Sequence, residues 1–381
     1  MGNNESQSFP LCHEPYAGSS MPFAYASIRA ANLSVNLLSN CIPPSIKHQS
    51  FHGVWSIVST YGAPEPRIGH FTVTDDDQKY SYIGYGKNGS RNFTDLWRLD
   101  LETLEWKEIT LKGDVFSKRN GSRAAYYNNS LIVFGGFFDK KYTSEMYIID
   151  INSGIVKKFE THGNIPSPRS SPVMAIDNEK LFIWGGYNGN YPNELNILDL
   201  KTLTWNSKDT AIHGRTSIPH VLIDHKIIGY GSSNNDGVLE IDTINDTVDI
   251  IPNSGSTPPP EHSGASMVAI GKYAIYYGGK SDDENTFMYA YDSKKHWWFI
   301  FHVLPDGETV TIADGHVTTN GLFMIPRIHS GSMLYSPKRK EIVCCMGSPI
   351  QRGIELSLFN VGTAFSVITQ REDMSEMLKL Q

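Results

Sequence analysis

The sequence predicts an all-β fold: a six-bladed β-propeller closed by an N-terminal strand and preceded by a flexible N-terminal tail. The first observation is a repeat, in which a glycine is followed eleven to fourteen residues later by Asp, and a bulky hydrophobic residue stands six residues after each Asp. The five copies contain Gly86, Asp100 and Trp106; Gly136, Asp150 and Val156; Gly186, Asp199 and Trp205; Gly231, Asp242 and Val248; and Gly279, Asp292 and Trp298. The second observation is the period. Successive glycines lie 50, 50, 45 and 48 residues apart, with 68 to a degenerate sixth copy at Gly347, which matches a four-stranded propeller blade.

The strands of each copy can be placed from the same register. A β-rich run leads into the glycines, as in residues 131–134, and a second leads into the Asp, as in residues 146–149. Glycine at the inner end of a strand allows neighbouring backbones to converge where a side chain would clash. We therefore expect the glycines near the propeller axis and the closing Trp residues between neighbouring sheets.

The sixth blade needs a fourth strand from elsewhere, because a propeller left open has two unpaired strand edges. Residues 54–59 contain Trp55, and Arg67 follows twelve residues later, close to the thirteen residues from Val156 to Arg169. Residues 363–369 compete for the same position. We predict that the N-terminal strand closes blade six.

These residues resemble the Kelch family, in which Gly-Gly follows the second strand, a third strand ends in Asp and Trp comes six residues later. The clearest copies read LIVFGGFFDKKYTSEMYIIDI and KLFIWGGYNGNYPNELNILDLKTLTW, and the resemblance covers roughly residues 54–368. It implies the propeller fold and, among its functions, protein-interaction adaptors, cytoskeletal binders and a few enzymes. Arginines at similar positions in ubiquitin-ligase adaptors of this family hold acidic peptides, so the resemblance implies an acidic or phosphorylated segment as ligand.

Basic residues precede or begin the inner strand of each copy, and they are the candidate binding residues. They are Arg67, His70, Arg119, Arg123, Arg169, Arg215, His220, His262, Arg327 and His329. The links that carry them emerge on the same face as the loops between second and third strands, so they would ring the channel mouth. Guanidinium groups there bind carboxylates or phosphates. The alternative is that arginines after Pro bond carbonyls across the blade junctions.

Two further features belong to this face. Aromatic residues follow two of the glycine pairs, and they act either as binding anchors or as packing between loops. They are Phe137, Phe138, Tyr142, Tyr187 and Tyr191. The link from Trp298 to Arg327 is 29 residues long, and we expect its insertion, residues 302–326, to form an ordered flap or small hairpin over the channel.

Length and composition fit one propeller with tails: residues 1–50 as a mostly disordered tail, 51–369 as the propeller and 370–381 as a short C-terminal tail. The chain has 381 residues, 40% of them hydrophobic. No stretch approaches the roughly 18 apolar residues of a membrane span, and no signal peptide is present. Four cysteines do not make a disulfide framework. We predict a cytoplasmic protein.

The N-terminus carries a lipidation motif. Met1 to Ser6 fits M-G-x-x-x-[ST], which predicts myristoylation of Gly2. One myristate binds membranes only marginally, and Cys12 is the candidate second anchor by palmitoylation. A chance match is the alternative. The motif predicts peripheral membrane contact.

The sequence favours a non-catalytic protein. Glu308, Asp314, His316 and His329 show no ligand spacing, no phosphate loop or nucleophile elbow occurs, and we predict no metal, cofactor or catalytic residue. A net charge of −7 and a pI near 6.0 argue against nucleic-acid binding. The leading hypothesis is an adaptor that binds a protein partner on the arginine-rimmed face. A structural or cytoskeletal Kelch protein is the alternative, and an enzyme acting on a small molecule the less favoured one. Partner identity and oligomeric state stay open.

Overall fold

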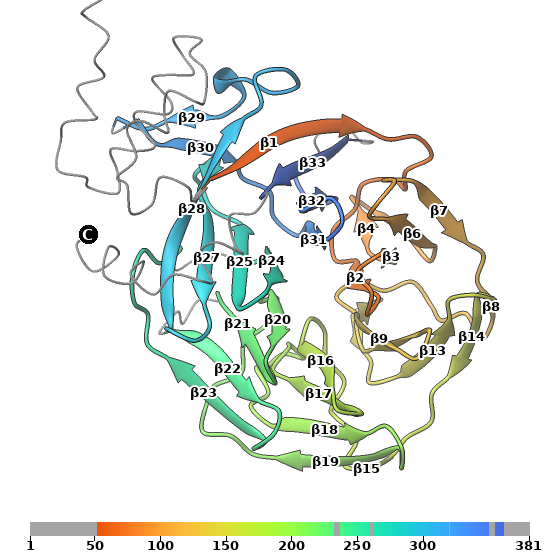
Figure 1. Cartoon of the computed structure of the whole chain (residues 1–381). Coiled ribbons are helices and arrows are strands. Elements are labelled where there is room, and N and C mark those ends of the chain that lie inside the picture. Colours follow the sequence, from red (N-terminus) through yellow and green to blue (C-terminus); the bar gives the residue numbers. More distant parts are fainter. Residues whose placement is uncertain (1–51, 232–236, 260–262, 320, 350–354, 362–381) are drawn as a thin grey trace, which may run out of the picture.

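The computed structural model describes residues 52–231, 237–259, 263–319, 321–349 and 355–361, which form a ring of six blades around a central channel (Figure 1). From the inner to the outer edge, blade one has β2 (Phe71–Thr74), β3 (Tyr80–Gly84), β6 (Leu96–Asp100) and β7 (Trp106–Ile109); blade two β9 (Arg123–Tyr127), β10 (Ser130–Phe134), β13 (Met146–Asp150) and β14 (Ile155–Lys158); blade three β16 (Val173–Asp177), β17 (Lys180–Trp184), β18 (Leu195–Asp199) and β19 (Thr204–Lys208). Blade four has β20 (His220–Ile223), β21 (Lys226–Gly229), β22 (Val238–Asp242) and β23 (Thr247–Ile251); blade five β24 (Ala265–Ile270), β25 (Tyr273–Gly278), β27 (Met288–Asp292) and β28 (Trp297–Pro305); blade six β31 (Ser332–Ser336), β32 (Glu341–Cys345), β33 (Glu355–Asn360) and β1 (His52–Ser59). The predicted six-bladed propeller is confirmed.

The hydrophobic core lies between the blades. Six clusters of described residues each join the facing sheets of two neighbouring blades. The closing residues Trp205 and Trp298 are buried in the second-to-third and fourth-to-fifth junctions. Cys344 and Cys345 face opposite junctions, on either side of β32. Because each blade buries both faces against its neighbours, the ring is stabilised as one unit.

The repeated Asp ends each third strand and binds the turn that follows. In blade three, Asp199 Oδ1 accepts the backbone N–H groups of Lys201 at 2.9 Å and Thr202 at 2.8 Å. The four other repeat aspartates accept the same pair of N–H groups. Asn360 replaces Asp in the sixth copy, where β33 is followed in the sheet by β1 and not by a strand reached through this turn.

The N-terminal strand closes the ring, as predicted. Residues 54–59 of β1 pair antiparallel with β33, while residues 52–55 pair parallel with the end of β28. Trp55 is buried and stacks on Phe359, with ring centroids 6.4 Å apart. The competing segment, residues 363–369, lies outside the described residues.

The structure contains a second connection between blades that was not predicted from the sequence. The chain leaving an outer strand pairs parallel with the outer strand of the next blade: β8 (Lys112–Gly113) with β14, and β15 (His162–Gly163) with β19. Gly255 makes the equivalent bridge to Trp298. The glycine has a left-handed φ of 82–85° at Gly113, Gly163 and Gly255. A Cβ atom added at any of these glycines would lie 2.6 Å or less from a carbonyl oxygen of the paired outer strand.

The long link before blade six is ordered, and the predicted hairpin is present. After the one-turn helix η3 (Ile312–Asp314), β29 (His316–Val317) pairs with β30 (Phe323–Pro326), which also pairs with β26 (Asn285–Thr286). The hairpin lies outside the ring beside β28 and β1 and not over the channel (Figure 1). Apolar packing holds the hairpin there, because Phe323 is buried and its ring centroid lies 6.4 Å from that of Trp55.

Candidate functional site

The inner links and the loops between second and third strands share one face, as the sequence predicts. In blades one, two, three and six the link pairs with the loop of its own blade, through Ile68 and Lys87, Asn120 and Phe137, Ser170 and Tyr187, and His329 and Ser348. Two of these loops are hairpins, β4 (Lys87–Asn88) with β5 (Arg91–Asn92) and β11 (Phe137–Phe138) with β12 (Lys141–Tyr142). We call this surface the loop face.

A chain of backbone hydrogen bonds surrounds the channel mouth on the loop face. One residue just before each inner strand has a left-handed φ, between 49° and 71°: Gly69, Gly121, Ser171, Ser217, Gly264 and Ser330. Each of the last five donates its N–H to the carbonyl of the preceding one, over 2.5–3.2 Å. These bonds hold the six inner strands in register around the mouth, so the channel rim is built from backbone.

The predicted arginines are buried beneath this rim. Arg169 is 0% exposed and donates to Glu194 Oε1 at 2.9 Å, to Gly185 O at 3.0 Å and to Ser167 O at 3.0 Å. Arg67 binds both carboxylate oxygens of Asp95, at 2.5 and 2.9 Å. Arg119 and Arg215 are buried in equivalent positions and donate to backbone carbonyls of their own blades. Arg327 is also buried, but it donates to Gly278 O of the preceding blade five.

The arginines therefore do not form an open ring of donors at the mouth. The side chains of Arg67, Arg119, Arg169 and Arg215 bind the second-to-third loop of their own blade. Arg327 instead spans the junction, as the alternative interpretation held, because it donates from the link before blade six to Asp283 O, Gly278 O and Asn285 O of blade five. The junctions are also spanned by backbone: the repeat glycine of the previous blade donates its N–H to the arginine's carbonyl, as Gly136 does to Arg169 O at 2.9 Å and Gly186 to Arg215 O at 2.8 Å. This bond does not depend on the arginine side chain, because Gly279 donates its N–H in the same way to Ile328 O at 2.9 Å.

The ion pairs change the charge of the loop face. Burial by itself raises the pKa of the Asp95 carboxyl, but the bonds from Arg67 outweigh it and leave this pKa lowered. The pKa of Glu194 is lowered in the same way: burial opposes its ionisation, and backbone N–H groups and Arg169 favour it more strongly. Arg119 binds Glu145 at 3.0 Å, and the pKa of Glu145 is also lowered, because the bond from Arg119 outweighs the effect of burial. The carboxylates of these loops stay ionised and are neutralised from below.

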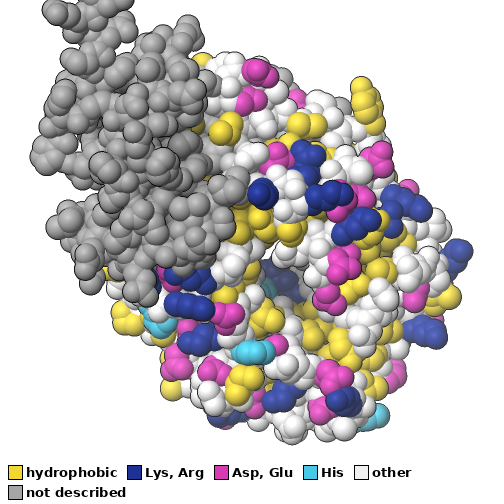
Figure 2. Space-filling view, viewed as in Figure 1, with side chains coloured by type: hydrophobic (Ala, Val, Ile, Leu, Met, Phe, Trp, Pro, Cys, Tyr) yellow, Lys and Arg dark blue, Asp and Glu magenta, His cyan; other side chains and the backbone are white. Residues whose placement is uncertain are grey.

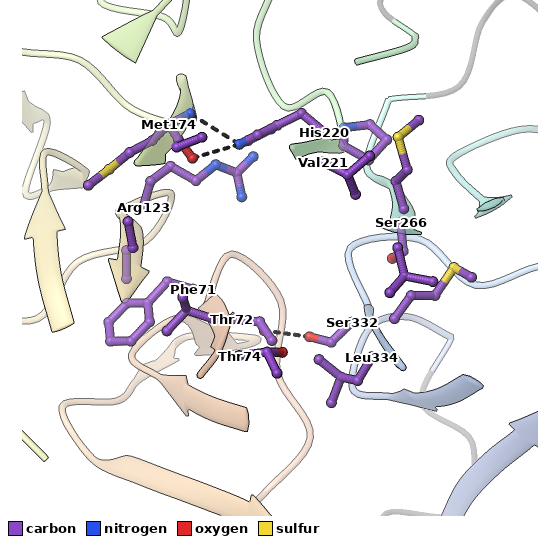
Figure 3. A pocket seen from close by; sticks show the side chains of 18 of the residues that line it. Phe71, Thr72, Thr74, Arg123, Met174, His220, Val221, Ser266, Ser332 and Leu334 are labelled. Carbon is purple, nitrogen blue, oxygen red and sulfur yellow. Dashed lines mark hydrogen bonds between the residues drawn. The ribbon is translucent and has the colours of Figure 1, made fainter. Parts of the chain in front are cut away.

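Three predicted residues meet in the channel, which has a volume of about 480 Å³ and appears as the hollow at the centre of the ring (Figure 2). His70 directly precedes the inner strand β2, and Arg123 and His220 are the first residues of the inner strands β9 and β20. Figure 3 shows Arg123 and His220. His70 Nε2 lies 2.7 Å from Ser332 Oγ, and Arg123 Nε donates to Pro172 O at 3.0 Å. His220 Nε2 lies 3.0 Å from Met174 O. Each bond joins neighbouring blades across the channel wall.

The two channel histidines are uncharged at neutral pH. Burial, together with the positive charges of Arg67 and Arg123, lowers the pKa of His70 to about 3. Burial and Arg123 lower the pKa of His220 to about 4. Burial lowers the pKa of Arg123 to about 10, so this side chain keeps its charge at neutral pH. It is the only Lys or Arg among the described residues that line the channel.

Aromatic side chains form a continuous row on the loop face across blades two and three. Successive ring centroids lie 4.7, 5.9, 5.1 and 5.6 Å apart along Phe137, Tyr142, Tyr187, Tyr191 and His213. Tyr187 and Phe137 are half-buried by this packing, while Tyr191 is 41% exposed, and the adjacent Phe138 39%. The residues pack against one another and still present an aromatic surface, which combines the two interpretations of these loops.

The remaining predicted residues fall elsewhere. His329 is half-buried and its Nδ1 lies 3.3 Å from Ser330 Oγ. His262, Gly2 and Cys12 lie outside the described residues. Within the described ranges no three His, Cys, Asp or Glu side chains gather as metal ligands. No helix there is long and apolar enough to cross a membrane.

Comparison with known proteins agrees with the fold. A family model described as the KLHDC2/KLHL20/DRC7 Kelch-repeats domain matches residues 50–231. Kelch domain-containing protein 2 of Homo sapiens is 27% identical over 183 residues, covering 39% of this chain and 45% of that protein. The protein of the same name from Bos taurus is 26% identical over 235 residues, with 58% and 52% covered. Acyl-CoA-binding domain-containing protein 5 of Arabidopsis thaliana is 28% identical over 171 residues, with 43% and 26% covered.

The matched stretches span about half or less of these relatives' own lengths. The six blades and these matches together support the Kelch-repeat family for this chain, and propellers of that family serve as protein-interaction modules.

Proposed function

We propose that the protein is a non-catalytic adaptor that binds an acidic or phosphorylated segment of a partner protein across the loop face of blades one to three. The observation that carries the proposal is the aromatic row of Phe137, Tyr142, Tyr187, Tyr191 and His213 beside exposed lysines. Aromatic rings that are held rigid by packing supply contact area at a low entropic cost, and such residues dominate protein-binding surfaces.

The charge of the second-to-third loops supports an acidic ligand. Asp95, Glu145 and Glu194 are already paired with buried arginines, as described above. Lys87, Lys140 and Lys141 then outnumber Asp139 among the charged loop residues without an intrachain ion pair. Complementary charge accelerates association and selects against basic partners. The buried arginines thus contribute to recognition indirectly, because they neutralise the carboxylates of the loop face.

The test is selection of peptides from paired acidic and neutral libraries on the purified full chain, followed by affinity measurement at rising salt. We expect acidic peptides to be enriched and their affinity to fall with ionic strength. The double variant Lys140→Glu/Lys141→Glu should weaken binding at least about tenfold. Tyr187→Ala/Tyr191→Ala should do the same through lost contact area.

Lys157→Glu is the matched control, since Lys157 is an exposed lysine on the outer strand β14. Its binding should equal that of the wild type. Enrichment of peptides without acidic residues, or equal affinity in the loop-face variants, would reject the proposal and favour a structural protein that uses its outer surfaces. Charge reversal of Arg67 or Arg169 is not a usable test, because both side chains are buried.

A further inference from the structure

Arg123 differs in its counter-charge from the buried arginines Arg67, Arg119 and Arg169. Arg67, Arg119 and Arg169 each hold a carboxylate, at 2.5, 3.0 and 2.9 Å. Arg123 Nε is fixed by Pro172 O, and no carboxylate is paired with its terminal amino groups among the described residues. Figure 3 shows its side chain extending into the open channel, with Thr72 of the neighbouring blade one and Ser332 of blade six further around the channel wall.

The described lining residues at the start of the inner strands offer this charge no carboxylate. Asp76 is the one carboxylate among the described lining residues. It lies in the turn after β2, beyond the far end of that inner strand, whereas Arg123 stands at the start of its own inner strand β9. His70 and His220 are neutral for the reasons given above. An unneutralised guanidinium in a narrow polar cavity attracts an anion from solution.

We propose that the central channel is a binding site for one small oxyanion, a free carboxylate or phosphate compound, held by Arg123. Guanidinium presents two parallel N–H donors that match the spacing of oxyanion oxygens. The Nε–H bond to Pro172 O fixes the fork in place. Hydroxyl groups of Thr72 and Ser332, 2.6 Å apart, supply further polar groups on the channel wall, on the next two blades around the ring. The volume of about 480 Å³ falls in the range of small-ligand pockets.

The site is separate from the proposed peptide surface. The peptide surface lies on the loops, whereas Arg123 stands in the inner strand β9, behind the backbone rim of Gly69, Gly121 and their equivalents. A variant of either site should therefore leave the other intact. This separation allows the two proposals to fail independently.

The experiment is isothermal titration of the full chain with inorganic phosphate and, separately, with acetate, at constant ionic strength and neutral pH. We expect saturable one-to-one binding of at least one anion with Kd below about 1 mM, and the two arms distinguish phosphate from carboxylate recognition. Arg123→Gln should weaken that binding at least about tenfold. Lys141→Gln, which alters only the loop face, should bind the anion as the wild type does.

A second variant covers the case in which Arg123→Gln does not fold. Val221→Phe keeps the arginine and narrows the channel, since Val221 lies on the inner strand β20 and lines the lumen (Figure 3). It should also lose the anion. Absence of saturable binding for both anions overturns the proposal, as does unchanged affinity in Arg123→Gln or, where that variant is unfolded, in Val221→Phe.

Discussion

Arg169 fastens two blades through different parts of one residue. Its side chain binds Glu194 and Gly185 O in blade three, and its carbonyl accepts the N–H of Gly136 from blade two. Removal of the side chain leaves a carboxylate and a buried carbonyl without their donors. Each such loss costs more than the bond itself contributes, because the group was desolvated on folding.

Arg169→Ala should therefore lower the free energy of unfolding by about 2–3 kcal/mol. Urea denaturation at neutral pH measures it. Arg91→Ala is the control, since the Arg91 side chain is 69% exposed in its pair with Glu65 and exposed pairs contribute at most about 1 kcal/mol. Equal losses in the two variants would show that the buried pair does not stabilise the fold.

Gly163→Ala tests the parallel pairing between blades. Gly163 has a φ of 84° and an added Cβ would lie 2.5 Å from Trp205 O. Gly62, the control, has a φ of 65° with nothing within 4 Å of an added Cβ. Both variants carry the cost of a left-handed alanine, about 1 kcal/mol. Only Gly163→Ala has the clash, so its melting temperature should fall further; equal shifts would contradict this.

At the scale of elements, β1 is the strand on which ring closure depends. β1 and β33 come from opposite ends of the propeller sequence, yet β1 pairs with β33 over six residues and with β28 over four. Trp55 anchors it in the cluster between blades five and six. Loss of this anchor removes apolar burial and leaves a cavity at the one junction where the two ends of the propeller meet.

Trp55→Ala should destabilise the protein by about 3–5 kcal/mol, measured by chemical denaturation. It should also increase protease cleavage near β1, because detachment of this strand opens the ring. Tyr61→Ala serves as control: Tyr61 is 92% exposed, and its removal should change neither quantity. A Trp55→Ala protein as stable as the wild type would mean that another segment closes blade six.

At the scale of the whole molecule, the channel histidines make stability depend on pH. His70 and His220 have pKa values of about 3 and about 4 in the folded protein, against 6.5 for an unperturbed histidine. Below pH 6.5 the unfolded chain therefore binds protons that the folded chain does not. Stability is full above that pH and falls as the pH drops toward the folded values, by at most about 1.4 kcal/mol per unit for each histidine.

Chemical denaturation between pH 7 and about pH 4.5 should show this loss, before the carboxylates such as Asp95 begin to protonate. The double variant His70→Gln/His220→Gln should have a much flatter profile. His225 acts in the opposite sense, because Asp177 raises its pKa and its contribution is lost as the pH rises through that value. A profile unchanged in the double variant would contradict buried neutral histidines.

The sequence predicted the blade count, the closing strand and the shared face because these follow from periodic residues. Gly136, Asp150 and their equivalents recur since each blade repeats the same local contacts: the glycine beside a neighbouring backbone and the Asp in its turn. The displaced Trp55 was visible in the same register. Gly113, Gly163 and Gly255 stand seven residues after their closing residues, so the parallel pairing also had a signal in the repeat.

Burial and position around the ring were decided only by the tertiary structure. In the sequence, Arg169 and Arg123 are both arginines near an inner strand, yet one is neutralised by Glu194 and the other faces the channel. The hairpin before blade six lies outside the ring because Phe323 packs beside Trp55 there. The repeat specifies contacts within a blade and between adjacent blades, and these contacts recur at the same positions of each copy. Whether a charge has a partner, and which apolar surface receives an insertion, depends on segments far apart in the chain that only the closed ring brings together.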